Sequence, residues 1–179
     1  MNCILDMERI PGRTQEIARI LAPLAPPSRR IACMRRLLNR QTVFAAHLGE
    51  EPSEPDPDQW RFPTRVPRIR ASYYEMWQPV QKGFCLNRAY LHIYVSRDQN
   101  EERQILALHC DPNELPSERH YFYKSGPHVH MSAAGDPLHR AHIALNTSNL
   151  KDVLRSVGDL TIALKTAVTM VDDQVLGLY

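Results

Sequence analysis

Histidines are the residues in this chain whose spacing most clearly suggests chemistry. Five of the eight histidines fall in one stretch, residues 120–142. His128 and His130 are two residues apart in a segment with strand character, and side chains at that spacing share one face of a strand. His139 and His142 are three apart and come together if their segment is a helical turn. We therefore expect several imidazoles to reach one point.

A metal site is the first chemistry that this pattern suggests. Three neutral imidazoles around one open coordination position are typical of catalytic zinc, while iron, manganese and nickel are alternatives. The sequence thus predicts a divalent metal cofactor, with zinc as the first candidate. Asp136 is a candidate carboxylate ligand. The candidate metal ligands, in order of expectation, are His128, His130, His142, His139 and His120.

Two alternatives to a metal stay open. His128, His130 and His142, the candidate catalytic residues, suit general acid and base catalysis without a metal, because imidazole titrates near neutral pH. Tyr121, Tyr123 and Lys124 would then stabilise developing negative charge. In the other alternative the histidines are structural or bind a partner.

The charge distribution is compatible with an anionic ligand. The net charge is only +2, but the first 49 residues carry eight arginines. Arginine forks bind phosphate or carboxylate through two parallel hydrogen bonds. Arg35, Arg36 and Arg40 are the candidate residues for an anion or partner, and a phosphoester or nucleic acid is the candidate substrate. The alternatives are an ordinary solvated surface and arginines that pair with the acidic stretch at residues 50–58.

The N-terminal third predicts helices followed by a linker. Residues 14–25 have apolar positions at helical spacing and begin at Thr14, a suitable N-cap. Residues 29–47 predict a second helix with an arginine-rich face. Residues 50–60 are acidic and proline-rich, which predicts a stiff linker. We therefore divide the chain into a helical segment (1–49), a linker (50–60) and an α+β body (61–179).

The body predicts strands followed by a long helix. Residues 65–80, 88–96, 103–110 and 119–125 have strand patterns, and the second and third should form a hairpin. His92 and His109 fall in these strands, and we interpret them as histidines of the sheet face. Apolar residues recur at helical spacing over 149–176. The predicted fold class is α+β: N-terminal helices, an antiparallel meander of about four strands, and a long C-terminal helix packed on the sheet.

Several classes of protein lack support in the sequence. The four cysteines contain no C-x-x-C pair, which argues against a zinc ribbon or a disulfide framework. No apolar run reaches the roughly 20 residues of a membrane span, and the first residues do not resemble a signal peptide. We expect a cytoplasmic protein without a membrane partner. Nucleotide-binding glycine loops, H-E-x-x-H and G-x-S-x-G are absent.

Two segments carry a resemblance to a known family. GPHVHM, residues 126–131, follows the predicted meander, and HRAHIALN, residues 139–146, comes next. In this order of elements, residues 64–176 resemble the ubiquitin-conjugating enzymes, which have a His-Pro-Asn turn and then a catalytic cysteine. No cysteine follows Cys110, so the resemblance implies an inactive relative that binds a protein partner. A non-catalytic interaction module is therefore the alternative to a hydrolase.

Overall fold

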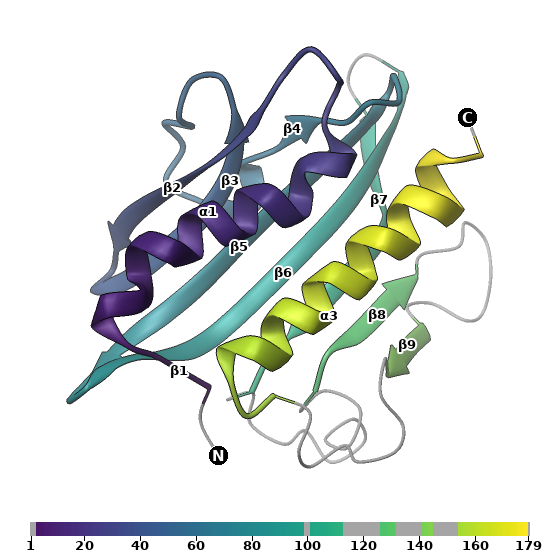
Figure 1. Cartoon of the computed structure of the whole chain (residues 1–179). Helices are drawn as coiled ribbons and strands as arrows, with labels where there is room; N and C mark the ends of the chain where they lie inside the picture. The colour runs from purple at the N-terminus through teal and green to yellow at the C-terminus, as the bar shows by residue number, and fades with distance from the viewer. Residues whose placement is uncertain (1–2, 99–100, 113–125, 132–140, 145–153, 179) are drawn as a thin grey trace.

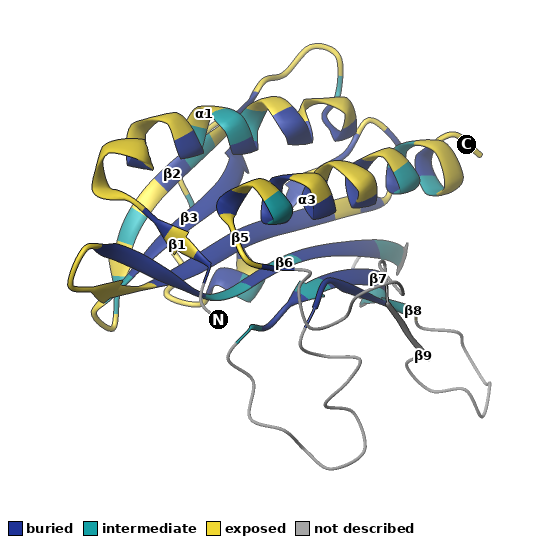
Figure 2. Ribbon diagram, turned by 60° about the horizontal axis from the view of Figure 1, so that its bottom comes forward, coloured by how far each residue is buried: buried dark blue, intermediate teal, exposed yellow. Residues whose placement is uncertain are grey.

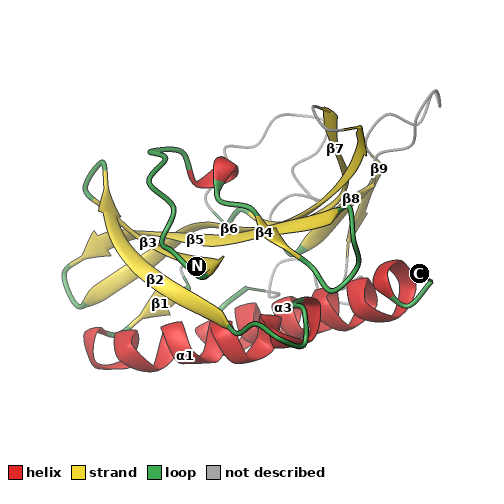
Figure 3. Ribbon diagram, turned by 90° about the horizontal axis from the view of Figure 1, so that it is seen from above, coloured by secondary structure: helices red, strands yellow, loops and turns green. Residues whose placement is uncertain are grey.

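One antiparallel sheet with two helices across one face makes up the described part of the protein. The structure is a computed structural model and describes residues 3–98, 101–112, 126–131, 141–144 and 154–178, with backbone alone for 97–98, 101 and 141–144. Both helices lie on the same side of the sheet (Figure 1, Figure 3). No helix in these residues is long and apolar enough to cross a membrane.

The sheet is a meander of nine strands within the described residues. The main path runs β2-β3-β5-β6-β7-β8-β9, while β1 pairs with β6 and β4 pairs with β5. The strands are β1 (Ile4–Leu5), β2 (Ile31–Leu38), β3 (Gln41–Leu48), β4 (Phe62–Pro63), β5 (Ile69–Val80), β6 (Gly83–Asp98), β7 (Glu101–Cys110), β8 (His128–Met131) and β9 (Ala141–Ala144). The predicted antiparallel sheet and the hairpin β6–β7 are confirmed. The expected number of about four strands is wrong.

Residues 29–47 are the largest error of the sequence prediction. They form the hairpin β2–β3 instead of a helix. Its two turn residues, Asn39 and Arg40, both have positive φ, as a two-residue type I′ turn requires. Strand β3 has apolar residues on both faces: Phe44 packs in the helix-side core, and Val43 packs on the opposite side. A strand buried on both faces lacks strict alternation, so its apolar residues also match helical spacing.

The two helices are amphipathic and bury their apolar faces against the sheet (Figure 2). Helix α1 (Ile10–Leu21) begins before the predicted Thr14, because Pro11 is well tolerated in a first helical turn. Helix α3 (Val157–Val171) begins with a capping box between Ser156 and Asp159 and continues into one π turn. The predicted start at 149 is outside the described residues. Residues 154–156 are not helical, and α3 runs through Gly158, where the sequence allows a kink or a break.

Two apolar clusters lie on opposite sides of the sheet. The larger one packs between the sheet and the helices and includes Leu91, Ile93, Leu108 and Val129. The smaller one lies on the other side, which we call the outer face, and contains Met34, Val43, Ala45, Trp60, Tyr74 and Met76. Because side chains alternate along a strand, the neighbours of the larger cluster's strand residues point to the outer face.

The acidic segment before β4 packs on the outer face. Trp60 is 1% exposed, and its indole N–H donates to the carbonyl of Glu54 at 2.8 Å. Asp58 accepts a hydrogen bond from the Tyr74 hydroxyl at 2.8 Å. Strand β3 before this segment pairs with β5 after it. The division at residues 50–60 stays a prediction, and strands from both sides of it belong to one sheet.

A buried ion pair connects α1 to the centre of the sheet. Arg13 is 2% exposed and Glu75 is fully buried, and the shortest of their hydrogen bonds is 2.5 Å. Tyr73 and Trp77 also donate to the Glu75 carboxylate. Arg13 donates further to Thr161 of α3 at 2.7 Å. Burial alone would lower the pKa of Arg13, but Glu75, together with Tyr73 and Glu16, more than offsets this and raises it.

Candidate metal centre

Four histidines from three neighbouring strands meet on the outer face. Strand β6 contributes His92, β7 contributes His109, and β8 contributes His128 and His130. Leu91, Leu108 and Val129, which alternate with these histidines, belong to the helix-side core, so the imidazoles point to the other side.

The strand register brings these rings together. Tyr90, His109 and His128 form one row across β6, β7 and β8, with each residue opposite the next. His92 and His130 flank Ala107 in the adjacent row. Ala107 lies between His92 and His130 in this row, and its small side chain leaves room for their imidazole rings. The ring centroids of His109 and His130 are 4.3 Å apart, and those of His128 and His130 are 4.8 Å apart.

Three of these histidines have the arrangement of metal ligands. One ring nitrogen each from His109, His128 and His130 lies within 4.8 Å of the others. Zinc–nitrogen bonds of about 2.0–2.1 Å in a tetrahedral site place ligand nitrogens roughly 3.4 Å apart. Small side-chain rotations would therefore close the cluster around one ion.

His128 has a defined tautomer. Its ring is 1% exposed, and Nδ1 lies 2.8 Å from the carbonyl oxygen of Gly126. A carbonyl only accepts, so Nδ1 carries the proton, and the lone pair of the neutral ring lies on Nε2. Metal-binding histidines typically donate their second N–H in this way, which orients the ring and makes the ligand nitrogen more basic.

His92 is held neutral beside the three candidate ligands. Its pKa is lowered from 6.5 to about 4: burial is the largest cause, Asp58 opposes the shift, and the positive charges of Arg61 and Arg88 contribute to it. His92 Nε2 lies 2.9 Å from His109 Nε2, and its Nδ1 lies 3.0 Å from the Tyr94 hydroxyl. Near neutral pH the ring can therefore accept a hydrogen bond from a neighbour.

The lowered pKa of His92 predicts a pH-dependent stability. In metal-free protein, the unfolded chain takes up a proton on His92 near pH 6.5, whereas the folded protein does so only near pH 4. The folded state binds fewer protons in this interval, so stability is lost as the pH falls through it. The full loss corresponds to about 3 kcal/mol. Chemical denaturation at about pH 7 and about pH 4.5 measures it.

The matched variant for this measurement is His92→Gln, which lacks the titrating ring. Its stability should fall less than that of the parent over the same pH interval. Equal pH dependence in the two proteins would contradict the assignment.

Arginine side chains border the histidines on the same face. Arg88 lies on β6 two residues before Tyr90, and its guanidinium carbon is 5.4 Å from the Tyr90 ring centroid. Tyr90 in turn stacks on His109 at 4.0 Å. No carboxylate of the described residues forms an ion pair with Arg88, whereas Arg61, over the Tyr94 ring, pairs with Glu102. Arg88 is thus a half-buried cation beside the cluster, and its Nε donates to the sulfur of Met76 at 3.0 Å.

The structure brings some of the predicted site residues together. His128 and His130 share a face, as their spacing predicts. In the backbone, His142 of β9 pairs with His130, but its side chain lies outside the described part. His120 and His139, with Asp136, Tyr121, Tyr123 and Lys124, also fall outside the described residues.

The sequence interpretation missed the contributions of His92 and His109. It placed both on a sheet face, which describes their position, but not that they meet His128 and His130. The available signal was the spacing of Tyr90, His92 and Tyr94, which places His92 on one face of its strand with two aromatic side chains. Only the pairing of β7 with β8, across residues far apart in sequence, brings the two sets together.

The predicted anion-binding arginines are on a strand rather than a helix face. Arg35 lies over the Phe84 ring of the helix-side core, whereas Arg36 lies over Trp60 on the outer face. Consecutive strand residues point to opposite faces, so these two do not form one patch. Arg40 occupies the β2–β3 turn. Their binding of an anion stays a prediction.

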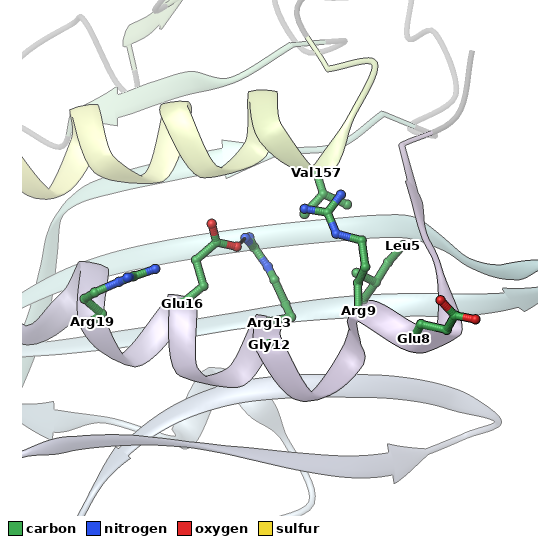
Figure 4. Close-up of a pocket in the computed structure, with 8 residues that line it drawn as sticks. All are labelled: Leu5, Glu8, Arg9, Gly12, Arg13, Glu16, Arg19 and Val157. Carbon is green, nitrogen blue, oxygen red and sulfur yellow. Dashed lines mark hydrogen bonds and ion pairs between the residues drawn. The ribbon is translucent and has the colours of Figure 1, made fainter.

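A separate hollow of about 280 Å³ lies beside the buried ion pair, between α1 and the start of α3 (Figure 4). Arg9, Arg13, Glu16 and Arg19 of this region line it together with Val157. Each Arg13 nitrogen already donates to a protein partner: Nε and Nη2 to Glu75, and Nη1 to Glu16 and Thr161. We therefore assign Arg13 to the structure of the core.

Comparisons with known proteins identify no relative. No protein-family model, curated protein or solved structure matches the chain. The resemblance to ubiquitin-conjugating enzymes has no support from these comparisons, and His128–Met131 is a strand of the sheet rather than a turn that follows it. The function must therefore be argued from the histidine cluster itself.

Proposed function

We propose that the protein binds a divalent metal ion, zinc first, through His109, His128 and His130, and uses it to hydrolyse an anionic ester such as a phosphoester. The observation that carries this proposal is the convergence of three imidazole nitrogens within 4.8 Å. A divalent ion with three imidazole ligands supplies Lewis acidity and a nucleophilic water at neutral pH.

The surrounding residues support the same reading. His128 is oriented by Gly126, so its ligand nitrogen is fixed before any ion arrives. His142 is a further candidate ligand, because its backbone pairs with His130. His120 and His139 stay candidates from the sequence alone.

Arg88 supplies the preference for an anionic substrate. Its guanidinium lies over Tyr74 and Tyr90, with centroid distances of 5.5 and 5.4 Å, and Tyr90 stacks on His109. A planar guanidinium matches the oxygens of a phosphate with two parallel hydrogen bonds. In this proposal Arg88 orients the charged group of the substrate beside the histidines.

Hydrolysis of p-nitrophenyl phosphate and bis(p-nitrophenyl) phosphate tests the proposed activity. Protein without a histidine tag is treated with a chelator and then reloaded with zinc or manganese. We expect metal-dependent turnover that falls at least about 100-fold in His130→Ala, because that variant removes a ligand. His47→Gln, which changes a histidine of β3 outside the cluster, should keep the parent rate.

The outcomes separate the candidate functions. Turnover that survives chelation would contradict the metal-dependent mechanism and favour acid and base catalysis by the histidines. The absence of turnover in protein shown to hold zinc would contradict the hydrolase and favour a binding module. Arg88→Gln should raise KM for the phosphoesters more than for neutral p-nitrophenyl acetate.

A further inference from the structure

His92 lies next to the proposed metal ligands and contacts one of them directly. It is 6% exposed, and its Nε2 is 2.9 Å from Nε2 of His109. Its other nitrogen, Nδ1, is 3.0 Å from the Tyr94 hydroxyl oxygen. Both ring nitrogens of His92 are therefore within hydrogen-bond distance of protein groups on the outer face.

The contact between the two imidazoles constrains their protons. A neutral imidazole carries one N–H, so one of the two facing Nε2 atoms must donate and the other must accept. If His109 binds a metal through Nδ1, its proton is on Nε2 and is donated to His92. His92 then carries its own proton on Nδ1, where the Tyr94 oxygen accepts it. This arrangement satisfies both contacts and leaves the Nδ1 lone pair of His109 for the ion.

The opposite arrangement is less suited to a metal site. If His92 donated from Nε2, His109 would accept with its Nε2 lone pair, and its proton would lie on Nδ1. Neither nitrogen of a neutral His109 would then offer a lone pair to an ion. Metal binding by His109 and acceptance by His92 are thus linked through one hydrogen bond.

We propose that His92 is a positioning residue that orients His109 and selects its Nδ1 as the metal-binding atom. This inference rests on the proposed metal site. His92 contacts His109 rather than the ion, and Tyr94 in turn holds His92. The arrangement extends to Asp58, whose carboxylate lies 4.0 Å from His92 Nδ1 and accepts from Tyr74.

Zinc affinity, measured by competition with a chromophoric chelator, tests this role. We expect His92→Phe, which keeps a ring but has no acceptor, to bind zinc about 10–100-fold more weakly than the parent. His92→Gln has an amide oxygen that can accept from His109, so it should recover most of the affinity. His47→Gln, which changes a β3 histidine whose Nδ1 contacts the carbonyl of Gly49, should bind as the parent does.

The absorption spectrum of the cobalt-substituted protein distinguishes positioning from ligation. A positioning role leaves the ligand set unchanged, so the visible bands of the His92→Gln protein should keep the parent's positions. Folded His92→Phe and His92→Gln proteins with parental zinc affinity would overturn the proposal. So would a changed cobalt spectrum in His92→Gln, because it would make His92 a ligand. If the parent itself binds no metal, the proposed function fails, which is a separate result.

Discussion

Arg13→Met is expected to lower the free energy of unfolding by about 3–5 kcal/mol, because it leaves the Glu75 carboxylate buried without its cation. Glu75 is fully buried and accepts hydrogen bonds from Arg13, Tyr73 and Trp77. Neutral donors alone compensate the buried charge poorly, since desolvation costs several kcal/mol per ion. Urea denaturation of parent and variant at the same pH measures the difference.

An exposed ion pair provides the matched control for Arg13. Arg65 and Asp172 are 2.8 Å apart, and their side chains are 35% and 31% exposed. Arg65→Met removes the same type of group, but water solvates the remaining carboxylate, so the expected loss is below about 1 kcal/mol. Similar losses in the two variants would contradict the special role of the buried pair. Arg13→Met/Glu75→Met should lose less than the sum of its single variants, because no buried charge remains.

The second large effect that we expect is on zinc affinity, when two of the three proposed ligands are removed. His128→Ala/His130→Ala removes two of the three converging imidazoles and leaves His109 to bind alone. Zinc affinity should fall at least about 1000-fold, which corresponds to about 4 kcal/mol of binding free energy. Chelator competition measures both affinities. Because His130 is part-buried and lies on a short strand, circular dichroism and the melting temperature must show that the variant is folded.

A further variant makes this prediction specific to the cluster. His47→Gln changes a histidine on β3, whose Nδ1 contacts the carbonyl of Gly49 at 3.2 Å. Its zinc affinity should equal that of the parent. A comparable loss in His47→Gln would contradict the assignment of zinc to the histidines of β7 and β8. His109→Ala, which removes the one ligand contributed by β7, should also weaken zinc binding, but by less than the double variant.

Local sequence patterns predicted the parts of the fold that have one buried face. Strands β6 and β7 alternate apolar and polar residues, and α1 and α3 repeat apolar residues at helical spacing. These periods identify the first two as strands and the other two as helices. The hairpin β2–β3 was misread because β3 is buried on both faces. Its turn, Asn39-Arg40, lacks the glycine that usually marks a type I′ turn, although both residues adopt positive φ.

The candidate site was only half predictable for a related reason. His128 and His130 are two residues apart, so strand geometry alone places them on one face. His109 joins them through the register of β7 with β8, and His92 joins through the register of β6 with β7. Register between strands depends on side-chain packing and turns across the whole sheet, which a local pattern does not specify.

The most direct test of the central claim is the metal content of purified protein. Chain produced without a histidine tag is incubated with zinc, freed of excess ion by buffer exchange, and analysed by plasma mass spectrometry beside folded His128→Ala/His130→Ala. We predict roughly one equivalent of zinc per parent chain and none in the variant, as a single closed three-histidine site requires. A parent without zinc, or equal zinc in the two proteins, would contradict the account.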